Sequence, residues 1–180
     1  MLFDLALLNN SNGSGLYANG PVNNVSVTNS MVAGHLTGAR GIVIWNGLKS
    51  NINISNNIIT NNNCCGIELQ DGTASDVTIN GNTIDIGIGD NAIGIMGLRN
   101  GTNNITNNII TGGGRFGIEI KNPDKANATI SNNTITLSTQ NSDLRDRAGI
   151  AVFRRFAGSG NPDGHPDVPS GVNITGNTVT

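Results

Sequence analysis

Two short patterns alternate along the chain. The first is a six-residue unit with apolar residues at its first and last positions and, in most copies, Asn at its fourth; it occurs at 27–32, 54–59, 79–84, 105–110, 130–135 and 174–179, with a degenerate copy at 3–8. The second is a Gly followed by alternating apolar residues, at 15–16, 41–44, 66–69, 94–95, 117–120 and 149–152. Apolar residues at every second position predict short strands, and the Asn and Gly residues between these strands predict tight turns. No stretch has a helical period long enough for a crossover helix, so we expect an all-β fold.

The fourth position of the six-residue unit repeats at a nearly constant interval. From Ala6 to Asn177 the spacings are 24, 27, 25, 26, 25 and 44 residues. A repeat of about 25 residues favours identical coils stacked on one another over a β-sandwich, because a sandwich does not require the same side chain at the same place in every unit. We therefore predict a single β-helix domain of about seven coils over residues 1–180.

The composition agrees with stacked coils. Only 3% of the residues are aromatic and 25 are Gly, so small aliphatic side chains must fill the interior as continuous columns. An amide has both a donor and an acceptor, so inward-turned Asn side chains can form a ladder from coil to coil. The predicted ladder residues are Asn57, Asn82, Asn108, Asn133 and Asn177, whereas Asn103 is expected in a turn outside the ladder.

The Ile-x-x-Asn-x-Ile and Gly-Ile-x-Ile registers resemble the repeats of the right-handed parallel β-helices of the pectate-lyase-like superfamily. This resemblance implies that the Gly-Ile strand is the first strand of each coil and that the strands flanking the Asn turn are the second and third. It also implies an extracellular or cell-surface location. It does not select one activity, because that superfamily includes lyases, hydrolases, epimerases, tailspikes and adhesins.

Charge and composition exclude several function classes. Charged residues make up 12% of the chain and the formal net charge is −2, so we expect no nucleic-acid partner. No apolar window approaches the ~20 residues of a membrane span. The only cysteines, Cys64 and Cys65, are adjacent; this spacing suits neither an ordinary disulfide nor a metal motif, and both are expected to be turn or core residues.

The two ends of the sequence show neither a capping helix nor a polar terminal repeat. An uncapped solenoid exposes sheet edges to other chains. We expect a fragment of a longer solenoid, or one whose ends are covered by flanking domains or by another chain.

Outward positions of the Gly-Ile strands are the candidate binding surface. Counted from each Gly, the first outward column is Tyr17, Val43, Glu68, Met96, Glu119 and Ala151, and the second is Asn19, Trp45, Gln70, Leu98, Lys121 and Phe153. The position after these is Gly20, Asn46, Asp71, Arg99, Asn122 and Arg154. Any outward face collects polar residues, so these columns alone do not establish a site.

The segments 136–148 and 154–171 are longer than their counterparts in other coils, and both flank the strand at 149–153. Extra length on both sides of one strand predicts a walled cleft.

These residues suit an acidic polysaccharide. Aromatic rings stack on sugar faces, and cationic side chains bind carboxylates. The substrate-binding candidates are Trp45, Gln70, Asp71, Arg99, Phe153, Arg155 and Tyr17. The catalytic candidates are Lys121, Glu119, Glu68 and Arg154. Glu68 and Glu119, two coils apart, would be about 9.6 Å apart at the backbone, at the upper limit for an inverting hydrolase.

No complete catalytic set of a lyase, hydrolase or epimerase is present, so two functions remain open. One is a carbohydrate-binding or polysaccharide-processing module, and the other is a structural spacer of an adhesin or tailspike-like protein. Carboxylates of Asp163 and Asp167 are candidate Ca²⁺ ligands, but turn chemistry alone explains the Asn-Pro-Asp-Gly segment. No cofactor is expected.

Overall fold

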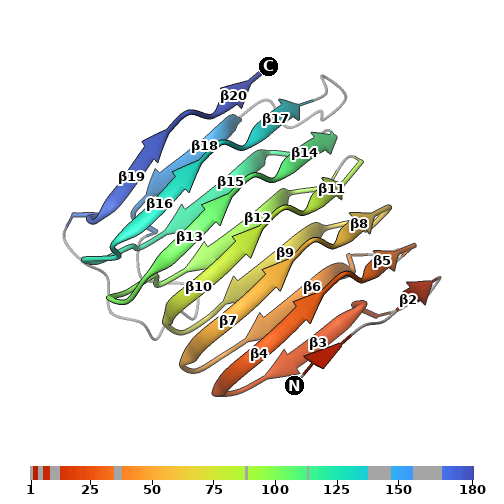
Figure 1. Cartoon of the computed structure of the whole chain (residues 1–180), viewed down its shortest axis with the longest axis horizontal. Coiled ribbons are helices and arrows are strands. Elements are labelled where there is room, and N and C mark those ends of the chain that lie inside the picture. Colours follow the sequence, from red (N-terminus) through yellow and green to blue (C-terminus); the bar gives the residue numbers. More distant parts are fainter. Residues whose placement is uncertain are drawn as a thin grey trace.

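A computed structural model of the chain describes residues 2–3, 6–8, 13–34, 38–87, 89–112, 114–137, 147–155 and 168–180. Every strand pairs in parallel with its counterpart in the neighbouring coil, so the chain forms a parallel β-helix. Figure 1 shows the coils stacked in sequence order, from the red N-terminal strands to the blue C-terminal ones. The all-β solenoid predicted from the two patterns is confirmed. No helix among the described residues is long and apolar enough to cross a membrane.

Three parallel sheets form the sides of the solenoid. Sheet A contains β1 (Leu2–Phe3), β4 (Val22–Thr28), β7 (Lys49–Ser55), β10 (Ala74–Asn80), β13 (Asn103–Thr106), β16 (Ala128–Ser131) and β19 (Val172–Thr175). Sheet B contains β2 (Ala6–Leu8), β5 (Met31–Ala33), β8 (Ile58–Thr60), β11 (Thr83–Asp85), β14 (Ile109–Gly112), β17 (Thr134–Leu137) and β20 (Thr178–Val179). Sheet C contains β3 (Leu16–Asn19), β6 (Arg40–Trp45), β9 (Cys65–Gln70), β12 (Asn91–Met96), β15 (Phe116–Lys121) and β18 (Ala148–Phe153). Each Gly-Ile strand therefore lies in sheet C, and the strands that flank the Asn turn lie in sheets A and B, in the order that the resemblance implies.

The interior consists of aliphatic columns that cross the coils. Ile42, Ile67, Ile93 and Ile118 are in register in sheet C, and all four are completely buried. Sheets A and B have equivalent columns, which include Ile54, Ile79 and Ile105 in sheet A and Ile59, Ile84 and Ile110 in sheet B. Because each residue lies over its equivalent in the next coil, a side chain of one shape fills the core without large rings.

The Asn ladder lies at the bend between sheets A and B. The Nδ2 of Asn108 donates to Asn133 Oδ1 at 2.9 Å and to the Ile79 carbonyl of the preceding coil at 3.0 Å. Asn108 Oδ1 in turn accepts from the backbone N–H and the Nδ2 of Asn82. The same bonds recur along the ladder, at Asn57, Asn82, Asn133 and Asn177. Asn or Gly precedes each ladder residue with φ between 56° and 66°, a conformation that these two residue types adopt most easily.

Asn103 lies outside the ladder, as predicted, but it belongs to a strand and not to a turn. This residue is completely buried at the start of β13, and its Oδ1 accepts from the Val77 N–H at 3.0 Å. Its Nδ2 donates to the carbonyls of Arg99 and Ala126. Asn103 therefore satisfies backbone groups at the bend from sheet C to sheet A, much as the ladder residues do at the next bend, and a turn pattern does not distinguish the two situations.

Candidate functional site

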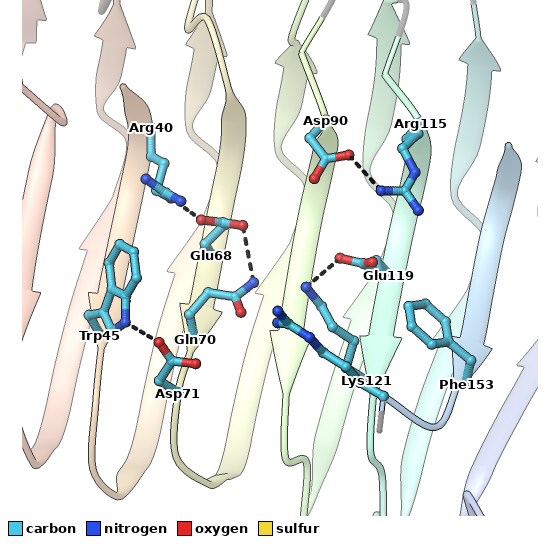
Figure 2. Close-up of a pocket in the computed structure, with 11 residues that line it drawn as sticks. Arg40, Trp45, Glu68, Gln70, Asp71, Asp90, Arg115, Glu119, Lys121 and Phe153 are labelled. Atoms are coloured by element: carbon cyan, nitrogen blue, oxygen red, sulfur yellow. Dashed lines mark hydrogen bonds and ion pairs between the residues drawn. The ribbon is translucent and has the colours of Figure 1, made fainter. Parts of the chain in front are cut away.

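A groove runs along the outer face of sheet C, across the strands. Its volume is about 520 Å³, and the residues that line it are Arg40, Trp45, Glu68, Gln70, Asp71, Asp90, Arg115, Glu119, Lys121, Phe153 and Arg155. Figure 2 shows these side chains on one face, carried by β6, β9, β15 and β18 and by the segments next to these strands and to β12. Trp45 and Phe153 lie at opposite ends of one outward column, four coils or about 19 Å apart. We call this feature the sheet C groove.

Strand register corrects the predicted columns at β12. Gly94 pairs with both Glu68 and Glu119, and Met96 pairs with Lys121. The position equivalent to Gly66 and Gly117 is therefore Ala92, and the prediction that counted from Gly94 was wrong by two residues. Met96 takes the second outward column but is completely buried, while Leu98, predicted to face outward, belongs to the core.

The Trp45 end of the groove is held together by polar contacts. The Arg40 guanidinium pairs with Glu68 Oε2 and lies 4.7 Å from the centre of the Trp45 ring. Glu68 Oε1 accepts from Gln70 Nε2 at 3.0 Å, and Trp45 Nε1 donates to Asp71 Oδ2. Figure 2 shows the contacts of Glu68 with Arg40 and Gln70 and, beside them, the contact of Trp45 with Asp71. Because each polar side chain has a partner, the ring is fixed in orientation before any ligand arrives.

The Phe153 end has a second group of contacts. Lys121 Nζ lies 2.8 Å from Glu119 Oε2, and the same oxygen accepts from Asn91 Nδ2 at 2.9 Å. The ring of Phe153 lies 6.0 Å from that of Phe116, centre to centre. The backbone of Arg155 is anchored because its N–H donates to Asn122 Oδ1 at 2.7 Å.

Charge is distributed unevenly along the groove. Up to β12, the lining has one positive group and three negative groups, so its formal charge is −2. The positive group is Arg40, and the negative ones are Glu68, Asp71 and Asp90. From Arg115 onward, the lining has three positive groups and one negative group, so its formal charge is +2. The positive groups are Arg115, Lys121 and Arg155, and the negative one is Glu119. Arg115 Nη1 lies 3.7 Å from Asp90 Oδ1, where the two halves meet. The groove as a whole is neutral, but its Phe153 end attracts anions.

Most of the predicted site residues line this groove. The structure brings together Trp45, Glu68, Gln70, Asp71, Glu119, Lys121, Phe153 and Arg155. Tyr17 is 57% exposed on β3, beyond the Trp45 end, and Arg154 does not contribute to the lining. Arg99 lies at the bend that follows β12, where its Nη1 donates to the carbonyls of Leu98 and Asn122. Its predicted place in the outward column is therefore also wrong, for the same register reason.

Three lining residues were missed by the sequence analysis: Arg40, Asp90 and Arg115. All three come one or two residues before the Gly of a sheet C strand or before Ala92, its equivalent in β12. The columns were counted only after the Gly. Three Arg residues, Arg40, Arg115 and Arg147, occupy this position in a chain with few charges, and that recurrence was a usable signal.

The two long segments predicted at 136–148 and 154–171 lie mostly outside the part of the chain that the structure describes. Residues 138–146 and 156–167 lie outside the described part of the chain, and so do the Ca²⁺ candidates Asp163 and Asp167. Among the described residues, no group of three or more His, Cys, Asp or Glu side chains could hold a metal ion. The cleft walls predicted on both sides of β18 stay a prediction.

The two cysteines depart from expectation. Cys64 lies in a bend and Cys65 is buried in the core, as predicted, but the two also form a disulfide between adjacent residues, which was not predicted. Cys65 is in register with Arg40, so the disulfide lies at the N-terminal edge of sheet C, beside the groove.

The family comparison agrees with the geometry. A family model described as "Right handed beta helix region" matches residues 4–157, most of the chain. The chain belongs to the right-handed β-helix family. Comparisons with curated proteins and with solved structures return no match. Family membership confirms the predicted fold and its handedness, and it is compatible with either polysaccharide binding or a structural role.

Proposed function

We propose that the sheet C groove binds an extended polysaccharide chain that lies along the solenoid axis. The observation that carries this proposal is the groove itself, about 19 Å long, with an aromatic ring at each end and fixed polar side chains between them. A compact metabolite would leave most of that length empty. Aromatic faces with hydrogen-bonding groups around them suit the alternating apolar faces and hydroxyl edges of sugars.

Charge supports a direction for the bound chain. The Phe153 end, with its formal charge of +2, suits a uronate carboxylate or a sulfate, with Lys121 and Arg155 as the binding cations. The Trp45 end carries −2 and suits neutral sugar hydroxyls, because the carboxylates of Asp71 and Glu68 accept hydrogen bonds. The predicted acidic polysaccharide thus finds support at one end of the groove.

The contacts favour binding over hydrolysis. An inverting hydrolase needs one protonated carboxyl group to act as general acid. Glu68 is paired with Arg40, and Glu119 is paired with Lys121, so each of the two carboxyl groups is already engaged by a cationic side chain. We therefore assign Glu68, Glu119 and Lys121 to ligand binding, and no reaction is proposed. The alternative, a structural spacer, predicts no ligand at all.

Titration calorimetry tests the proposal with three probes: hexagalacturonate, cellohexaose and a hyaluronan hexasaccharide, in which uronate and N-acetylglucosamine alternate. We expect at least one probe to bind the wild-type chain and to bind Trp45→Ala about tenfold less tightly. Tyr17→Ala is the matched control, because Tyr17 is an exposed aromatic residue of sheet C outside the groove. If none of the three probes binds, the groove proposal is wrong and the spacer function is favoured.

A further inference from the structure

A lysine lies inside the solenoid near the Trp45 end of the groove. Lys49 is the first residue of β7 and is completely buried. The residues in register with it along the column, Val22, Ala74 and Leu98, are all apolar. Burying a cation costs free energy unless hydrogen bonds compensate for the lost water. A lysine in an apolar column of the repeat therefore requires an explanation, and its contacts supply one.

The ammonium group of Lys49 joins two consecutive coils. Its Nζ donates to the Gly47 carbonyl of its own coil at 3.0 Å and to the Asp71 carbonyl of the next coil at 3.2 Å. Asp71 has a positive φ of 47°, an uncommon conformation for a residue other than Gly, and the bond from Lys49 to its carbonyl helps to hold it. Lys49 therefore links the bend after Trp45 to the bend that contains Asp71.

Asp71 connects this buried contact to the groove. Its carbonyl accepts from Lys49, and its Oδ2 accepts from Trp45 Nε1 in the groove. Because the carbonyl and the carboxylate belong to the same residue, a displacement of the Asp71 backbone also moves the acceptor of the indole N–H. An indole that has lost this acceptor can adopt other rotamers. The orientation of the Trp45 ring therefore depends on a hydrogen bond made by Lys49.

The lysine and the tryptophan occur together in one coil. Trp45 is the last residue of β6, and Lys49 is the first residue of β7. Neither neighbouring coil has a lysine or an aromatic ring at these positions, which hold Val22 and Asn19 in one coil and Ala74 and Gln70 in the other. The lysine is therefore present where a ring has to be oriented and absent from the two neighbouring coils, where there is none.

We propose that Lys49 is a positioning residue of the groove, which holds Asp71 in place and through it sets the Trp45 ring for stacking on a sugar. This inference rests on the proposed function of the groove. Lys49 itself is buried and touches no ligand. Its effect on binding is indirect, because a ring that is already oriented loses less conformational freedom when a sugar stacks on it.

Lys49→Leu tests this role, because Leu98 shows that the same column accepts a leucine. The probe is whichever of hexagalacturonate, cellohexaose and the hyaluronan hexasaccharide binds the wild-type chain most tightly in titration calorimetry. We expect Lys49→Leu to bind this probe about tenfold less tightly than wild type. Ile52→Val is the matched control, since it removes a methyl group from a buried residue of the same strand. It should lower the melting temperature and leave the affinity unchanged.

Two further measurements show whether Lys49 acts through Asp71. Asp71→Ala removes the carboxylate that holds the ring, so adding Lys49→Leu to it should lower the affinity no further, whereas independent effects would multiply. Fluorescence anisotropy decay of Trp45, the single Trp of the chain, reports the motion of the indole without any ligand. This motion should increase in Lys49→Leu and in Asp71→Ala, and it should stay as in wild type in Ile52→Val.

The positioning role is wrong if Lys49→Leu loses stability but keeps the affinity and the indole motion of wild type, because the lysine is then purely structural. The groove proposal still stands in that case where Trp45→Ala weakens binding. Unchanged indole motion in Asp71→Ala also overturns the positioning role, and this result does not depend on whether Lys49→Leu folds. If no probe binds the wild-type chain, both proposals are wrong.

Discussion

Lys121 and Glu119, two residues apart on β15, form an ion pair of 2.8 Å on the floor of the groove, and only 8% and 4% of their surfaces are exposed. Such a pair holds the ammonium group at a set position, close to the ring of Phe153 in the next coil. Asn91 donates to the same carboxylate oxygen, so two donors hold the Glu119 side chain in place.

Removing the ammonium group should make ligand binding less sensitive to salt. We expect Lys121→Met to lower the affinity for an acidic oligosaccharide about tenfold at low ionic strength, and the difference from wild type to shrink as salt rises, because the screening length falls from ~10 Å at 0.1 M to ~3 Å at 1 M. Lys125→Met is the control, since Lys125 is exposed and lies outside the groove. Equal losses for Lys121→Met and Lys125→Met would contradict an acidic subsite at Lys121.

The single Trp of the chain provides a direct optical test of the groove. A sugar that stacks on Trp45 should change its fluorescence, and the binding curve followed in this way should agree with calorimetry. The effect of Trp45→Ala on affinity should persist at high salt, because stacking does not depend on screened charges. A ligand that binds by calorimetry and leaves the fluorescence unchanged would place the binding site elsewhere.

Interrupting the ladder should destabilise the fold strongly. Asn108→Ala removes the acceptor of the Asn82 N–H and Nδ2 groups and the donor to the Ile79 carbonyl, at about 1 to 3 kcal/mol per unsatisfied buried group. Asn104→Ala is the matched control on β13, the strand just before this bend, where Asn104 lies between two buried residues. Its effect on the free energy of unfolding should stay within about 0.5 kcal/mol. Urea unfolding followed by circular dichroism measures both values. A similar midpoint for the two variants would show that the ladder bonds contribute little.

Two glycines at the bend between sheets C and A allow the stability cost of steric overlap to be measured apart from that of backbone strain. Gly72 and Gly20 both have positive φ, 128° and 99°. A Cβ atom on Gly72 would lie 2.1 Å from the Gly47 carbonyl oxygen, whereas a Cβ atom on Gly20 would meet nothing within 4 Å. Gly72→Ala should therefore cost about 1 to 3 kcal/mol more than Gly20→Ala, the usual range for forced overpacking. Thermal unfolding of the two variants measures the difference, and equal losses would mean that the coils separate easily at this bend.

Counting outward residues from the Gly of each sheet C strand failed at one strand, β12. In five coils, counting from the Gly placed the outward residues of sheet C correctly, because the Gly occupies the same corner in each of them. In β12 that corner is taken by Ala92, and the only Gly of the strand faces outward. Glycine can occupy either place, so its position in the sequence did not reveal the shift.

The sequence by itself determined the solenoid. Ile and Asn at constant spacing can be buried and hydrogen-bonded only if each residue lies over its equivalent, so the repeat alone leads to coils, to the aliphatic columns and to the ladder. The outward columns predicted most of the groove lining, but only the tertiary structure decided the contacts within the groove. Which side chains pair across coils, such as Arg40 with Glu68 and Asn91 with Glu119, depends on strand register and on the reach of side chains between coils. Those contacts join residues 28 positions apart, and no local pattern encodes them because they form only after the coils have stacked.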